Sequence, residues 1–196
     1  MKEIVMKALQ FVKEYFKDVT DGSEYYHAER VYRKAMHLAK EEKANNFVVA
    51  LAAILHGVEP KNNRRTKNCP TVRAFLESFD LDKRIIDIVI DIICNIDFEN
   101  RKNNNLRSIE HKVVFDANLL DSIGAVGIAR NFAYGGYHKI NMYDGNISNE
   151  NMIKVFYERL LTAKDYFQTF TGKQLAVRRH EFMERFLQEF YFEWNV

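Results

Sequence analysis

Residues 47–56, FVVALAAILH, constrain the fold most, because a helix of this sequence is apolar on nearly every side. A helix without a polar face is buried all round, as at the centre of a helical domain. Asn45 and Asn46 precede this segment as candidate caps, and Gly57 and Pro60 follow it as stop signals. We therefore expect other helices to pack around this one.

Helical spacing of apolar residues recurs along the rest of the chain, and glycine (8) and proline (2) are scarce. This pattern argues against a turn-rich β-sandwich or barrel. It predicts an all-α fold, a compact helical bundle with residues 1–196 as a single domain. The helices are expected over 1–17, 24–43, 47–56, 71–79, 82–96 and 109–134, with two more after residue 149 that are broken near Thr171–Gly172.

The glycines of the GAVGIA stretch, residues 124–129, lie in the middle of the helix expected over 109–134. Each costs a helix about 1 kcal/mol relative to alanine. Such glycines usually mark a helix boundary or a close approach of another backbone. Asp121 is a candidate cap for a helix that begins there.

Composition limits the partners and the compartment. Lys plus Arg (29) nearly balances Asp plus Glu (27), so net charge gives no argument for binding a nucleic acid polymer or a membrane surface. Cys69 and Cys94 are too few for a disulfide scaffold and are expected to be reduced thiols. The N-terminal segment lacks the features of a signal peptide, and no apolar run approaches the roughly 20 residues that span a bilayer. These features favour a cytoplasmic protein.

Three polar side chains are predicted on helix faces that are otherwise apolar: His27, His56 and Asp116. Taken singly, each histidine has a structural alternative as a hydrogen-bonded core residue, and Asp116 has one as a paired carboxylate. Two imidazoles and one carboxylate together suit a divalent metal ion. The spacing along the chain does not show that the three meet.

Four segments resemble the HD superfamily of metal-dependent phosphohydrolases, and the small single-domain bacterial members in particular. YYHAERV resembles the family's H-x-x-R-V segment, and ALAAILH resembles its buried A-A-L-L-H helix. FDANLLDSIGAVGIARNFAYGG is similar to the D-A-D-x-L-D-A-I-G-A-I-G-I-A-R segment. The last helices also resemble those of this subgroup, so that the resemblance covers residues 20–195.

The resemblance implies a divalent metal (Mn, Mg, Co, Fe, Ni or Zn) held by His27, His56 and Asp116. It also implies hydrolysis of a nucleotide or another small phosphorylated molecule by a metal-activated water. Basic residues near the expected ligands are candidates for binding phosphate. For those in the loop that follows Pro60, the alternative is a run of solvated charges. For Arg130, the alternative is a structural ion pair. The residues expected to bind the substrate are Lys61, Arg64, Arg65 and Arg130. The residues expected to act in catalysis are Arg30 and the acidic Glu59.

The chain departs from the family pattern at the metal. Gly57 stands where the family has the aspartate of its HD pair, and as a helix C-cap it can adopt the left-handed conformation but supplies no oxygen. Asn118 stands where the family usually has a second aspartate. Glu59 is the nearest acid that could substitute. The metal is therefore expected to be weakly bound or absent, which leaves a weakened phosphohydrolase or an inactive nucleotide-binding or protein-interaction module, as a monomer or homodimer.

Overall fold

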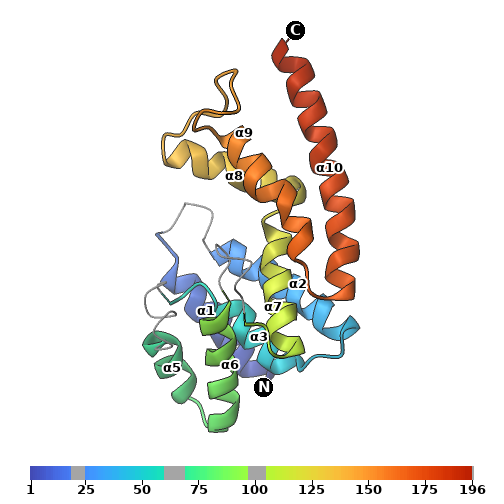
Figure 1. Ribbon diagram of the computed structural model, residues 1–196. Helices are drawn as coiled ribbons and strands as arrows, with labels where there is room; N and C mark the ends of the chain where they lie inside the picture. The colour runs from blue at the N-terminus through green and yellow to red at the C-terminus, as the bar shows by residue number, and fades with distance from the viewer. Residues whose placement is uncertain (19–24, 60–68, 97–104, 196) are drawn as a thin grey trace.

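The computed structural model describes residues 1–18, 25–59, 69–96 and 105–195 (Figure 1). Within these ranges the chain is helical and has no strand, which confirms the all-α prediction. The helices are α1(Lys2–Tyr15), α2(Tyr25–Glu41), α3(Asn46–Leu55), α5(Pro70–Glu77), α6(Lys83–Asn95), α7(Ile109–Asp121), α8(Gly124–Tyr137), α9(Met152–Val155), a π-helical turn η2(Phe156–Leu160), a 3-10 segment η3(Leu161–Tyr166) and α10(Phe170–Asn195).

Helix α3 is the centre of the fold, as its composition predicts. Every residue from Val48 to Leu55 is buried, and α1, α2, α6 and α7 all pack against it. Asn45 caps its start, because the side-chain oxygen accepts hydrogen bonds from the backbone N–H groups of Phe47 and Val48. This arrangement holds His56, the residue after α3, at the inner end of a buried helix.

The segment expected to be one helix over 109–134 is two helices. Helix α7 ends at Asp121 and α8 begins at Gly124. Gly124 has φ +75°, a left-handed conformation that favours glycine, and a Cβ at Gly127 would overlap the backbone carbonyl of Ser122. The two glycines therefore create a helix boundary and a close backbone approach, the two roles that such glycines usually have.

The last two helices break slightly earlier than expected, over Phe167–Thr169 rather than at Thr171–Gly172. Helix α10 then runs to Asn195, beside α7 at its start and α8 further along (Figure 1). In Figure 1, α1 to α7 form the lower part of the molecule. Helices α8 and α9 and the C-terminal end of α10 form the upper part. The junction of α7 and α8 lies between these two groups.

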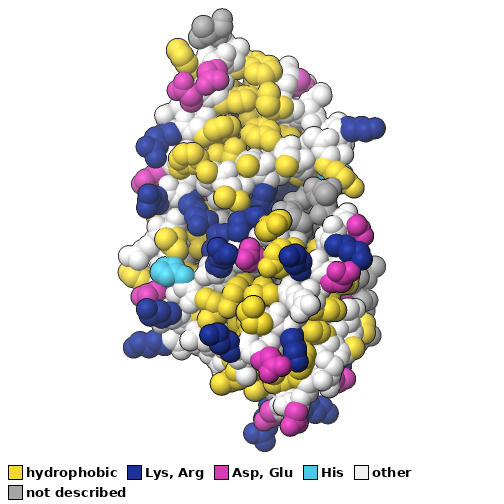
Figure 2. All heavy atoms as spheres, turned by 180° about the vertical axis from the view of Figure 1, so that it is seen from behind, with side chains coloured by type: hydrophobic (Ala, Val, Ile, Leu, Met, Phe, Trp, Pro, Cys, Tyr) yellow, Lys and Arg dark blue, Asp and Glu magenta, His cyan; other side chains and the backbone are white. Residues whose placement is uncertain are grey.

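None of the helices in the described part of the chain is long and apolar enough to cross a membrane. Figure 2, seen from behind, shows Lys and Arg side chains gathered across the middle of the molecule, with exposed hydrophobic side chains above and below them. Cys69 is buried and Cys94 is partly buried.

Candidate functional site

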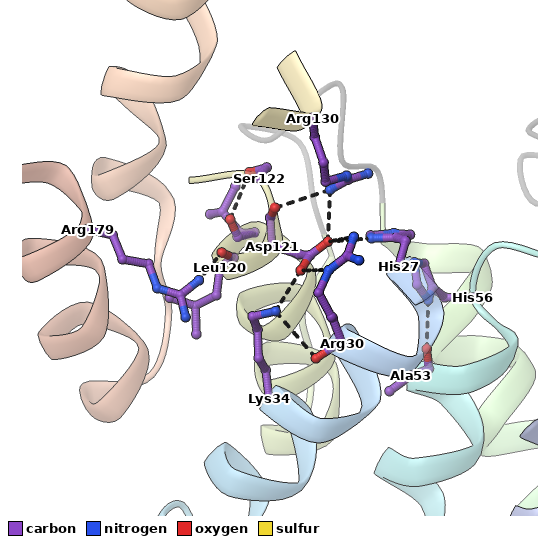
Figure 3. Close-up of polar contacts among 11 residues, drawn as sticks. His27, Arg30, Lys34, Ala53, His56, Leu120, Asp121, Ser122, Arg130 and Arg179 are labelled. Atoms are coloured by element: carbon purple, nitrogen blue, oxygen red, sulfur yellow. Dashed lines mark hydrogen bonds and ion pairs between the residues drawn. The ribbon is translucent and has the colours of Figure 1, made fainter. Parts of the chain in front are cut away.

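His27 from α2 and His56 after α3 lie side by side. Their ring centroids are 5.3 Å apart and their planes are nearly perpendicular, and both residues are buried (Figure 3). The Nδ1 of His56 lies 2.7 Å from the carbonyl oxygen of Ala53. Because a carbonyl oxygen only accepts, Nδ1 of His56 carries a proton and donates to it. We call these two residues the histidine pair.

His27 is oriented in the same way by a carboxylate. Its Nδ1 donates to Asp121 Oδ2 at 2.8 Å, which places the lone pair on Nε2. Burial is the largest influence on His27 and lowers its pKa, although the hydrogen bond to Asp121 acts in the opposite direction. The ring is therefore neutral at physiological pH.

Three cationic side chains converge on the same carboxylate, Asp121, which is fully buried. Its Oδ1 accepts from Arg30 Nε at 2.9 Å and from Lys34 Nζ at 2.6 Å. Its Oδ2 accepts from Arg130 Nη1 at 3.0 Å, and Arg130 also donates to the Asp121 backbone carbonyl. We call His27, Arg30, Lys34, Asp121 and Arg130 the Asp121 cluster.

The Asp121 cluster carries an excess of positive charge that reaches the surface. Burial alone would raise the pKa of Asp121, but hydrogen bonds from His27 and Arg30 overcome this effect and hold it well below its ordinary value. The side chains of Arg30, Lys34 and Arg130 remain 29%, 18% and 26% exposed, whereas that of Asp121 is 0% exposed. One buried carboxylate thus orients three cations, each of which remains partly exposed.

The structure does not bring Asp116 to the histidine pair. Both of its oxygens accept from the backbone N–H of Gln168, and Oδ2 also accepts from the backbone N–H and the hydroxyl of Thr169. Asp116 and Asp121 are five residues apart on α7, which turns their side chains about 140° from each other. The carboxylate beside His27 is therefore Asp121, and Asp116 instead fixes the turn before α10.

The environment of Asp116 also bears on its charge. Burial raises its pKa to about 6, although the hydrogen bonds from Thr169 and Gln168 act to lower it. Gly172, in the first turn of α10, leaves the space that this carboxylate fills, because a Cβ there would overlap Asp116 Oδ2. The close fit with Gly172 and Thr169 accounts for a buried carboxylate here without a metal ion.

Glu59, expected to act in catalysis, is buried with 2% of its surface exposed. Its Oε1 accepts from the backbone N–H of Val72 at 2.9 Å, in the first turn of α5. A carboxylate at this position satisfies a free N–H and lies at the positive end of the helix dipole. This contact is structural. The predicted substrate residues Lys61, Arg64 and Arg65 lie outside the described residues.

The donor set of the site does not suit a firmly held divalent ion. The histidine pair offers imidazole nitrogens, but the oxygens of Asp121 are already bonded to cations, and Gly57 supplies no ligand atom. Asn118, one turn before Asp121 on the same side of α7, offers only an amide. In the described part of the chain no three His, Cys, Asp or Glu side chains are arranged to hold a metal ion.

Sequence reasoning missed two residues of the site. Lys34 was not singled out, although it lies one turn after Arg30 and two after His27 on one face of α2. Asp121 was interpreted as a cap for α8, but that helix is preceded by Ile123 and has no side-chain cap. A usable signal was present in α2, whose one face carries His27, Arg30 and Lys34 beside a buried apolar stripe. Such a face predicts a carboxylate on the helix that packs against it.

Comparison with known proteins finds one curated relative and several solved structures that are similar to this chain over most of its length. The chain is 33% identical to the uncharacterized protein YpgQ of Bacillus subtilis over 183 residues, 91% of this chain and 88% of YpgQ. An HD-superfamily hydrolase from Bacillus thuringiensis superposes with a TM-score of 0.80 and 35% identity, covering 100% of this chain and 98% of that one. The structure of YpgQ in complex with ADP superposes with a TM-score of 0.79 and 29% identity, covering 96% and 97%. No protein-family model matches the chain.

Proposed function

Because the chain belongs to the HD superfamily of hydrolases, we propose that it binds a nucleotide and holds the phosphate groups with Arg30, Lys34 and Arg130 beside the histidine pair. The observation that carries this proposal is the Asp121 cluster, in which three partly exposed cations are oriented by one buried carboxylate. Guanidinium groups bind phosphate oxygens in bidentate fashion, and a preoriented cation loses less entropy on binding. The ADP complex of the relative YpgQ supports the same ligand class.

Charge favours binding over metal-dependent hydrolysis as the main role. A divalent ion beside the histidine pair would face Arg30, Lys34 and Arg130 with no uncommitted carboxylate among the described residues to offset the repulsion. A phosphate group meets the same cations with the opposite sign. The Nε2 lone pair of His27 can then accept a hydrogen bond from a hydroxyl or amino group of the nucleotide.

Calorimetric titration of the purified protein with ADP tests the proposal. Arg30→Ala and Lys34→Ala should each weaken ADP binding by about tenfold or more, since a charge-assisted hydrogen bond contributes about 1.5–3 kcal/mol. Arg33→Ala is the matched control on the same helix, because Arg33 is 72% exposed and its ion pair among the described residues is with Glu29. Binding that is absent in the wild type, or equally weakened by all three substitutions, would overturn the proposal.

Hydrolysis is the second candidate, and one observation favours it. Each histidine of the pair donates its Nδ1 hydrogen, one to a carboxylate and one to a backbone carbonyl. Metal-binding histidines are held in this way, with Nε2 left to the ion. If the HD-type site has lost its metal through Gly57, restoring an aspartate there should recover metal binding.

Gly57→Asp is sterically allowed. Among the described residues, a Cβ at Gly57 would meet the Phe16 ring, at 3.5 Å, and Gly57 does not use the left-handed conformation that glycine permits. We expect the substitution to raise the affinity for Mn²⁺ by about tenfold or more, as measured by titration calorimetry and elemental analysis. Gly136→Asp, at an open position on α8, is the control for added negative charge. An unchanged affinity for Mn²⁺ would argue against a lost HD-type metal site.

A further inference from the structure

A second basic hollow lies on the other side of the α7–α8 junction from the histidine pair. It has a volume of about 360 Å³ and is lined by the start of α8 and by one face of α10, including Arg178, Arg179 and Arg185. Leu175 and Phe182 form its apolar part. In Figure 3, Arg179 reaches from α10 toward Leu120, on the far side of Asp121 from His27. None of these residues belongs to the Asp121 cluster.

Among the described residues, the three arginines of the hollow have no acidic partner in an ion pair. No carboxylate lines the hollow, and Arg178, Arg179 and Arg185 form no ion pair with any residue that the structure describes. Glu184, on the same helix, pairs instead with His180. Three cations in one concavity repel one another, and the positive end of the α8 dipole adds to the same potential. These charges together favour an anion in the hollow.

Arg179 is the anchor of this hollow. Its guanidinium donates to the backbone carbonyl of Leu120 at the end of α7, and a Cβ at Gly124 would press on its side chain at 3.1–3.3 Å. Burial lowers the pKa of Arg179, and the charge of Asp121 acts only weakly against this. A fixed, half-buried cation without a contacting carboxylate gains more from an anion than a mobile surface arginine does.

We propose that this hollow is a second anion site, which binds the phosphate group of a small phosphorylated molecule. Arg178, Arg179 and Arg185 contact the phosphate oxygens, and Leu175 and Phe182 contact an apolar or planar part of the same molecule. The side chain of Phe182 is 41% exposed, which leaves a ring face open for stacking. The site stands on residues that the proposed nucleotide contacts of the Asp121 cluster do not use, so the two can be tested separately.

The test is calorimetric titration of the full-length protein with inorganic pyrophosphate and with ADP. The double variant R178A/R185A should weaken pyrophosphate binding at one class of site by about tenfold or more. The same site should persist in the Arg30→Ala variant. Phe182→Ala should weaken ADP at this site while leaving pyrophosphate within about twofold. Both arginines are exposed and make no described ion pair, so the double variant is expected to fold.

Lys173→Ala is the matched control, because Lys173 is an exposed cation on α10 that does not line the hollow. Pyrophosphate binding that is unchanged in R178A/R185A, or reduced equally by Lys173→Ala, would overturn the second site. Loss of binding in R178A/R185A together with wild-type binding in Arg30→Ala would support it even if the Asp121 cluster proves not to bind nucleotide. If R178A/R185A weakens pyrophosphate binding but Phe182→Ala leaves ADP binding unchanged, the proposed apolar contact would be overturned.

Discussion

Replacing Asp121 with asparagine is expected to lower the free energy of unfolding by about 3–5 kcal/mol, because it leaves three partly buried cations without their counter-charge. For a chain of this size, this loss corresponds to a fall in Tm of roughly 6–20 °C. The carboxylate is 0% exposed and bonds to Arg30, Lys34, Arg130 and His27 at 2.6–3.0 Å. Urea denaturation and thermal unfolding at pH 7.5 both measure the effect.

Asp165→Asn is the control, since Asp165 is exposed and has no hydrogen bond through its side chain in the described structure. A loss below about 1 kcal/mol would mean that the three cations are solvated well enough not to need Asp121.

The pH dependence of this effect has a definite sign. The pKa of Asp121 is lower in the folded protein than its ordinary value, so its contribution to stability is fully present above pH about 4. It is lost as the pH falls toward the folded-state pKa. The difference in unfolding free energy between the wild type and Asp121→Asn should therefore be constant from pH 6 to 8 and shrink only in acid.

The sequence predicted the helices of this fold well because their signals are local. The apolar run of α3, the Asn45 cap and the scarcity of glycine and proline act within a few residues of one another. The sequence analysis expected one helix over 109–134 and raised the α7–α8 break only as an alternative, through the glycines of the GAVGIA stretch. Whether Gly124 ends a helix or lies within one depends on its φ of +75° and on the approach of Ser122, which are tertiary features.

The site was predicted less completely because it depends on which faces of separate helices meet. Resemblance singled out His27 and His56, and these rings do lie together. It could not distinguish Asp116 from Asp121, since both are carboxylates on the same buried helix. Only the packing of α2 and α10 against opposite sides of α7 decides which one faces His27.

Replacing Asp116 with asparagine separates these two interpretations of the α7 carboxylates. We expect it to lower the free energy of unfolding by about 3 kcal/mol at pH 7.5, because an amide places its own hydrogens against the N–H groups of Gln168 and Thr169. Denaturant unfolding measures the loss. Thr169→Val, which removes only the hydroxyl donor, is the milder companion and should cost about 1 kcal/mol.

ADP affinity at a temperature where Asp116→Asn remains folded decides the role of Asp116. The Asp116 carboxylate faces the turn before α10 and contacts Thr169 and Gln168 rather than the histidine pair, so ADP binding should stay within about twofold of the wild type. A residue that holds a metal ion in the ligand site would behave in the opposite way, with a large loss of binding and little loss of stability. Comparing the loss of unfolding free energy with the loss of ADP affinity in Asp116→Asn therefore shows whether α7 presents Asp116 to the start of α10 or to the ligand.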